Sequence, residues 1–132
     1  MVAALSKEAA TDRVQAWLAG QAPADLVVSE WVITEISSAF ALKLRTGEFT
    51  QDQRSAALGF FNAMISDSLE VLPVPAPHFR TAAHFCDQYD LGLRAADALH
   101  LAVSAAHGAT LMTLDRRMAM AGPSLGLSTC LL

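Results

Sequence analysis

The sequence has few cysteines, no long apolar run and no secretion signal. Its two cysteines, Cys86 and Cys130, lack the paired spacing of a zinc site and the density of a disulfide-rich domain. We therefore expect both to be buried thiols in a reducing compartment. Charged residues or prolines interrupt every apolar stretch before it could span a bilayer, and the apolar residues 1–5 lack the basic flank of a signal peptide. These absences predict a cytoplasmic protein without membrane contact.

Basic residues are also scarce. Nine Lys and Arg against thirteen Asp and Glu give a formal net charge of -4. Non-specific nucleic-acid binding requires many phosphates to be neutralised by Lys and Arg, so the composition excludes a protein that wraps nucleic acid through bulk electrostatics. Five basic residues nevertheless lie close in sequence to the acidic residues discussed below: Lys43, Arg45, Arg94, Arg116 and Arg117. Any contact with nucleic acid should therefore be local.

The length and the pattern of apolar residues predict one α/β domain over residues 1–132. With 132 residues, of which 53% are hydrophobic, the chain has room for one core, and it contains no repeat, linker or low-complexity segment. Helices are predicted over residues 6–18, between Ser29 and Gly47, between Thr50 and Asp67, from Pro77 through 89, over 93–107, and briefly after Asp115. Short apolar runs predict strands over 26–28, 69–74, 110–114 and 127–131. Alternation of the two implies a parallel sheet covered on both faces.

Side chains on two of the predicted helices form apolar stripes. Thr50 with Gln53 fits a capping box at the start of the second of these helices. The stripe of the first comprises Ile33, Ile36, Phe40 and Leu44, and that of the second comprises Ala57, Phe60, Phe61, Met64 and Ile65. We expect these stripes, aromatic residues included, to belong to the core.

Three acidic residues fall close to the carboxyl ends of predicted strands, where ligands bind open parallel sheets. Glu35 lies early in the helix after the first strand, and Asp115 directly follows the strand over 110–114. Asp97 lies among small alanines in the first turns of the helix before that strand. Clustered carboxylates repel one another unless a cation lies between them, and oxygen ligands favour Mg²⁺ or Mn²⁺. Together the three predict a metal site.

Each acidic residue also has a purely structural explanation. Glu35 could complement the positive end of its helix, Asp115 could cap a helix, and Asp97 could pair with Arg94. His100 shares a helical face with Asp97 and could act as a base or ligand, although a helical histidine between two leucines is more commonly a packed residue. Thr113 points to the same side of its strand as Asp115 and could orient that carboxylate or a metal-bound water. These alternatives stay open at the level of sequence.

Two stretches of the chain carry a family resemblance. Residues 96–102 read Ala-Asp-Ala-Leu-His-Leu-Ala and residues 113–116 read Thr-Leu-Asp-Arg; together they resemble the C-terminal half of PIN-domain ribonucleases, most closely the bacterial VapC toxins. Residues 29–39, with Glu35, resemble the second acidic motif of that family. The likeness covers nearly the whole chain, and its most specific part is the alanine-framed Asp97 motif combined with Asp115.

The resemblance implies a three-layer α/β/α fold with a central, mainly parallel sheet. It also implies a toxin that cleaves RNA with Mg²⁺ or Mn²⁺ held by four acidic residues, acts as a homodimer and is neutralised by a cognate antitoxin. Glu35, Asp97 and Asp115 match the second, third and fourth acids. The first acid, which in the family ends an N-terminal strand, has no match, and residues 1–5 look like the start of the helix that follows it. We therefore expect that strand to be missing through truncation, through degeneration, or because another chain supplies it.

The function expected from this resemblance is metal-assisted phosphodiester hydrolysis, with Glu35, Asp97 and Asp115 as ligands. Arg94, Arg116 or Lys43 would position the RNA backbone. With one carboxylate fewer, activity should be weakened or absent. Two rivals remain: a catalytically impaired PIN-like remnant that binds an antitoxin without cutting RNA, and an unrelated α/β domain whose acidic residues are helix caps and ion-pair partners.

Overall fold

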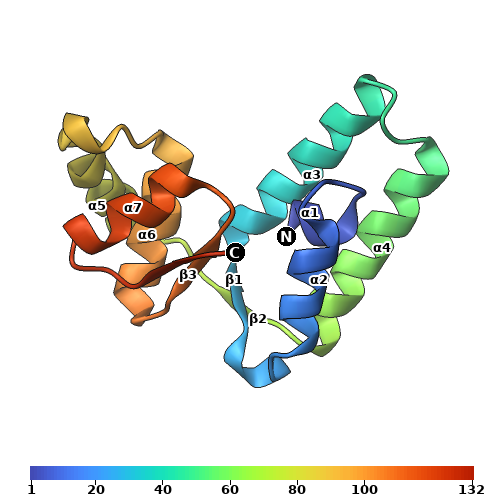
Figure 1. Cartoon of the computed structure of the whole chain (residues 1–132), viewed down its shortest axis with the longest axis horizontal. Helices are drawn as coiled ribbons and strands as arrows, with labels where there is room; N and C mark the ends of the chain where they lie inside the picture. The colour runs from blue at the N-terminus through green and yellow to red at the C-terminus, as the bar shows by residue number, and fades with distance from the viewer. The chain divides into compact units, whose positions relative to one another are not determined.

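The computed structural model describes all of residues 1–132 and divides them into two compact units, Met1–Pro73 and Val74–Leu132. Each unit contains helices and one pair of parallel strands (Figure 1). None of the helices is long and apolar enough to cross a membrane. The expectation of a single domain over residues 1–132 stays a prediction, and the two units are described one at a time.

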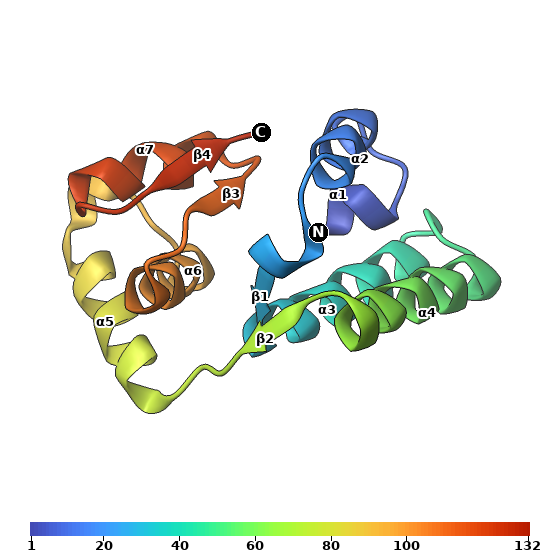
Figure 2. The ribbon, with the colours of Figure 1, turned by 90° about the horizontal axis from the view of Figure 1, so that it is seen from below.

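The N-terminal unit contains four helices and two strands. In chain order these are α1 (Val2–Leu5), α2 (Thr11–Ala19), β1 (Val27–Ser29), α3 (Glu30–Arg45), α4 (Gln51–Asp67) and β2 (Glu70–Leu72), with a 3-10 turn at Pro23–Asp25. Helices α3 and α4 lie side by side in both ribbon views (Figures 1 and 2). Strands β1 and β2 pair in parallel, with Val27 opposite Glu70.

The core of this unit lies between α3 and α4 and is formed by Ile36, Phe40 and Phe61, of which at most 1% is exposed. The predicted stripe of α3 is therefore confirmed at Ile36 and Phe40. For α4 the prediction is wrong at Phe60, whose side chain is 62% exposed. Successive residues of a helix point about 100° apart, so Phe60 and Phe61 do not both face α3.

The start of the first predicted helix is also wrong. A helix was expected from Ser6, but residues 6–10 form a break between α1 and α2. Thr11 Oγ1 accepts a hydrogen bond from the Glu8 N–H at 2.8 Å and donates one to the Ser6 carbonyl at 2.6 Å. Side-chain hydroxyls that bond to nearby main-chain groups compete with helix formation, and here they fix a turn. The end of α2 at Gly20 agrees with the prediction.

The C-terminal unit contains α5 (Ala76–Asp87), α6 (Ala95–His107), β3 (Leu111–Thr113), α7 (Arg116–Ser124) and β4 (Thr129–Leu131), with a 3-10 turn at Tyr89–Leu91. Helix α6 packs against α5, and α7 packs against both strands. Six residues of α6 are buried: Ala98, Leu99, Leu101, Ala102, Val103 and Ser104. Gly108 ends α6 in the left-handed conformation, with φ 61°, as the sequence predicts.

The strands confirm the predicted mixed α/β class, since they run parallel and alternate with helices. They pair as β1 with β2 and as β3 with β4, in two separate two-stranded sheets, so every strand has one open edge. Two of the three residues of β4, Cys130 and Leu131, are exposed. Cys130, expected to be buried, is exposed there, while Cys86 on α5 is partly buried; both cysteines are free thiols.

Candidate functional site

The predicted acidic residues belong to different units of the structure. Asp97 and Asp115 lie in the C-terminal unit, on α6 and at the start of α7, and Glu35 lies in the N-terminal unit on α3. A different secondary-structure element therefore positions each of the three carboxylates. No group of three or more His, Cys, Asp or Glu side chains is gathered closely enough to hold a metal ion.

Asp115 caps helix α7 and remains exposed. Its Oδ1 atom accepts hydrogen bonds from the N–H groups of Arg117 at 2.7 Å and Met118 at 3.1 Å. The hydroxyl of Thr113, a buried residue of β3, accepts a hydrogen bond from the Asp115 N–H at 3.0 Å. One carboxylate oxygen is thus used for capping and the other makes no hydrogen bond. Thr113 orients the main chain of Asp115 and not its carboxylate.

Asp97 is the third residue of α6 and is partly buried. Its Oδ2 atom accepts a hydrogen bond from the main-chain N–H of Arg94 at 3.1 Å. This bond ties the carboxylate to the residue before the helix, and it involves the peptide group of Arg94 and not the guanidinium. Like Asp115, Asp97 keeps one carboxylate oxygen that makes no hydrogen bond within the protein. Capping and ligand binding are therefore compatible at both residues.

Glu35 lies in the second turn of α3, beyond the first turn in which Glu30 stands. The helix dipole acts mainly within the first turn, so the structural explanation by the positive helix end applies to Glu30 better than to Glu35. Glu35 is close to α1: burial lowers the pKa of the Met1 amino group, and the carboxylates of Glu8 and Glu35 partly offset that lowering. Glu35 is partly buried and is engaged in an interaction of its own.

Two arginines of the predicted site are exposed, and a third residue links the segments that carry Asp97 and Asp115. Arg94 and Arg116 both face solvent. Arg117 Nη1 donates a hydrogen bond to the carbonyl of Gly92 at 3.0 Å, across 25 positions of sequence. This bond joins the first turn of α7 to the loop before α6. No local spacing signals it, and sequence reasoning had grouped Arg117 only with the nearby cations.

His100 is partly buried between two buried leucines and is engaged in an interaction. The surroundings therefore favour the packed histidine that its helical position suggested. The donors that remain for a cation are carboxylate oxygens, which are the ligands Mg²⁺ prefers. The carboxylate oxygens of Asp97, Asp115 and Glu35 are therefore of the chemical type that binds such an ion.

Comparison with known proteins adds the family. The sequence model of the PIN domain family matches residues 1–122, a stretch that includes Glu35, Asp97 and Asp115. PIN domains are generally metal-dependent nucleases and often act as toxins. No curated protein matches the chain in sequence. Because the match covers most of the chain, from α1 into α7, the chain belongs to the PIN domain family.

Proposed function

We propose that the chain is a metal-dependent endoribonuclease toxin of a toxin–antitoxin pair that hydrolyses RNA phosphodiester bonds. The observation that carries this proposal is the PIN-domain match over residues 1–122. Nucleases of this family typically use Mg²⁺. The proposal also includes the site residues, an RNA substrate and an antitoxin partner.

Glu35, Asp97 and Asp115 are the proposed metal ligands and catalytic residues. Asp97 and Asp115 suit this role because a main-chain hydrogen bond holds one oxygen of each carboxylate and leaves the other for a ligand. A bound Mg²⁺ or Mn²⁺ would activate water and stabilise the charge that develops on the attacked phosphate. The three carboxylates would bind and orient that ion.

Three further residues support the site in this proposal. Thr113 fixes the main chain at Asp115, and the exposed Arg94 and Arg116 bind the RNA phosphates. Arginine suits this task because its planar guanidinium donates two parallel hydrogen bonds to a phosphate. A homodimer, a cognate antitoxin and a cytoplasmic location complete the proposal, which takes them from the family resemblance.

The proposal is tested by incubating the purified chain with a structured RNA in Mg²⁺ or Mn²⁺ and, separately, in EDTA. We expect cleavage that depends on the divalent ion and that falls by about a hundredfold or more in Asp97→Asn and Asp115→Asn. An asparagine keeps an oxygen that accepts the same capping hydrogen bond, so these variants remove the charge without removing the cap. The matched control is Asp52→Asn, which changes an exposed aspartate in the first turn of α4.

Cleavage that persists in EDTA, or that Asp97→Asn and Asp115→Asn leave unchanged, would contradict the proposal. A second measurement covers a weakly active chain. The melting temperature should rise with added Mg²⁺ in the unsubstituted chain and in Asp52→Asn, and not in Asp97→Asn, because an ion that binds only the folded state stabilises it. Absence of both effects would favour the rival, a catalytically impaired domain that binds an antitoxin.

A further inference from the structure

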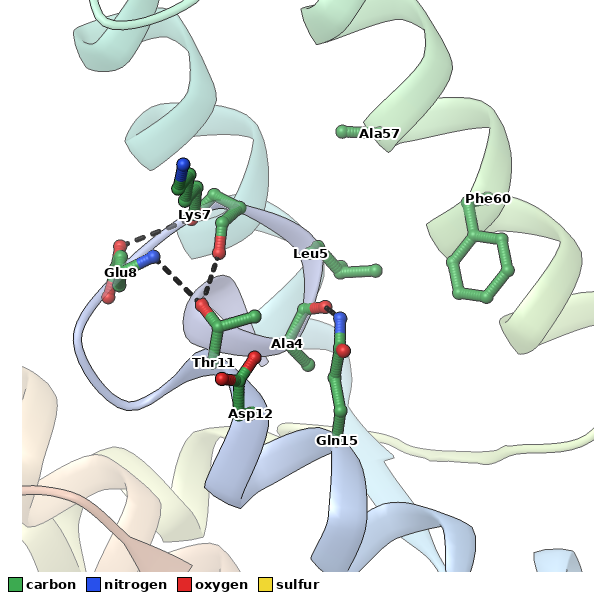
Figure 3. A pocket seen from close by; sticks show the side chains of 10 residues that line it. Ala4, Leu5, Lys7, Glu8, Thr11, Asp12, Gln15, Ala57 and Phe60 are labelled. Carbon is green, nitrogen blue, oxygen red and sulfur yellow. Dashed lines mark hydrogen bonds between the residues drawn. The ribbon is translucent and has the colours of Figure 1, made fainter.

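A hollow of about 500 Å³ opens on the N-terminal unit between α1, α2 and α4. Figure 3 shows its lining: Leu5 of α1 and Gln15 of α2 lie opposite Phe60 of α4 across an open space, with Ala57 of α4 beside it. All of its walls come from residues 1–73. The hollow is therefore a property of one unit, and it contains none of the residues of the proposed nuclease site.

One wall of the hollow is an aromatic ring that the core does not use. Phe60 is 62% exposed, whereas its neighbour Phe61 is 1% exposed and fills the core. Leu5 and Ala57 extend the apolar surface beside the ring. A large exposed aromatic side chain beside a hollow offers a ligand both apolar contact and an electron-rich face.

The facing wall presents hydrogen-bond acceptors. Asp12, in the first turn of α2, is exposed and makes no hydrogen bond or ion pair. One turn later, Gln15 donates from Nε2 to the Ala4 carbonyl at 2.8 Å, which leaves its Oε1 atom as a second unused acceptor. Residues three apart lie on one face of a helix, and Figure 3 shows both side chains at the hollow. This wall therefore suits a group that donates several hydrogen bonds.

The other charged residues that line the hollow, Lys7 and Glu8, do not neutralise the charge of Asp12 on the side that faces Phe60. Glu8 is paired with Lys43 at 3.1 Å. Lys7 lies next to Glu8, on the far side of the hollow from Phe60 (Figure 3). The side between α2 and Phe60 thus carries one uncompensated negative charge.

The net charge of the N-terminal unit also favours a cationic ligand. Residues 1–73 contain nine acidic and five basic residues, and residues 74–132 contain four of each. The net charge of -4 therefore belongs entirely to the N-terminal unit. A field of this sign attracts cationic groups and repels RNA phosphates.

We propose that this hollow binds an arginine side chain of a partner polypeptide. The guanidinium stacks on Phe60 and donates hydrogen bonds to Asp12 and to Gln15 Oε1, while its methylene groups contact Leu5. Arginine fits better than lysine because a planar cation with several donors can stack on an aromatic face and bond in its own plane at the same time. The proposal goes beyond the ribonuclease function and does not depend on it.

The test uses the full chain, labelled with ¹⁵N, and titration with N-acetyl-leucyl-arginine amide followed by chemical shifts. We expect saturable shifts at amides of α1, α2 and α4. The matched probe is the same peptide with citrulline, which has the shape of arginine without its charge and should bind about twofold to fivefold more weakly, the range for one exposed charge pair. A peptide with glutamate should cause no saturable shift.

Substitutions assign the binding to the hollow. Asp12→Asn should bring the arginine peptide down to the affinity of the citrulline peptide, and Phe60→Ala should weaken both peptides. Asp52→Asn, an exposed acidic residue of α4 outside the hollow, should leave both affinities unchanged. Shifts that centre outside the hollow, equal affinities for arginine and citrulline in the unsubstituted chain, or no saturable shifts at all would overturn the proposal.

Discussion

At the scale of single residues, Asp115 is a helix cap, and its other carboxylate oxygen stays available for the proposed role as a metal ligand. The sequence left both roles open, and the structure shows a cap that uses Oδ1 alone. A capping role therefore does not exclude a role as metal ligand, and substitutions can distinguish the two roles. The same holds for Asp97, whose bond to the Arg94 N–H occupies Oδ2 alone.

We predict that Asp115→Ala lowers the free energy of unfolding by about 1 kcal/mol, because two N–H groups of α7 lose their acceptor. Asp115→Asn should stay close to the unsubstituted chain, since asparagine is an equally good N-cap. Urea unfolding followed by circular dichroism measures both. Equal destabilisation by the two substitutions would mean that the carboxylate charge, and not the cap, stabilises this helix.

At the scale of elements, the packing of α7 on β4 depends on a glycine. A Cβ atom added to Gly122 would lie 2.6 Å from Thr129 Oγ1 and even nearer to Cγ2. Thr129 is not free to turn away, because its hydroxyl donates to the Ala119 carbonyl at 2.6 Å. The close approach of helix and strand therefore requires glycine at this position.

Gly122→Ala should lower the free energy of unfolding by about 1–3 kcal/mol, the usual cost of overpacking. Gly59→Ala on α4 is the matched control, because the added Cβ there would meet no side chain or other segment of the protein within 4 Å beyond its own chain neighbours. Since alanine favours helix over glycine, this control should raise stability by up to about 1 kcal/mol. Chemical denaturation of both variants gives the comparison, and a neutral Gly122→Ala would show that α7 moves away from β4 at little cost.

A second link between elements is Lys43 of α3, which pairs with Glu8 at 3.1 Å and Glu48 at 3.0 Å. The hydrogen bond from Lys43, and then that from Thr46, lowers the pKa of Glu48, while hydrogen bonds to Glu48 and Glu8 raise the pKa of Lys43. A lowered glutamate pKa stabilises the fold above the ordinary value of about 4.3 and loses that effect as the pH falls through the folded value. A raised lysine pKa stabilises it below about 10.4 and loses that effect as the pH rises through the folded value.

We therefore predict that Lys43→Met lowers the urea midpoint at pH 7, and that the difference from the unsubstituted chain shrinks as the pH falls below the ordinary glutamate value of about 4.3 or rises well above the ordinary lysine value of about 10.4. Methionine keeps an apolar stem beside Phe49, so the change reports mainly on charge. Lys7→Met serves as the control, since Lys7 is exposed and makes no ion pair. A difference that stays constant from pH 3 to pH 11 would assign the effect to packing.

The elements that could be predicted from sequence are those with local signals. Thr50 and Gln53 form the expected capping box, Gly108 takes the left-handed conformation, and Asp115 caps α7. The break between α1 and α2 was missed because it depends on how the Thr11 hydroxyl is shared between Ser6 and Glu8. The division of the strands into two sheets depends on pairing between distant segments, which periodicity does not encode.

At the scale of the molecule, the division of charge between the two units is more informative than the net charge of the chain. The total of -4 suggested only that nucleic-acid contact is local, whereas the two units differ: the N-terminal unit carries the whole excess and the C-terminal unit is balanced. Three of the four arginines of the C-terminal unit, Arg94, Arg116 and Arg117, lie next to the segments with Asp97 and Asp115. The proposed site residues can be singled out from the sequence because they lie in short motifs, while the charge difference becomes visible only with the unit boundary.

If RNA is the substrate, this asymmetry predicts which arginines bind it. Arg116→Gln should weaken the binding of a labelled RNA to a similar degree for different sequences and reduce the slope of log affinity against log salt by about one, as expected for one lost phosphate contact. Arg13→Gln removes an exposed arginine of α2 in the acidic unit and should change neither quantity. Fluorescence anisotropy over a series of salt concentrations, with Ca²⁺ in place of Mg²⁺ to slow cleavage, measures both. If the two substitutions reduced affinity and slope equally, the phosphates would contact the whole molecule and the local interface expected at the C-terminal unit would be wrong.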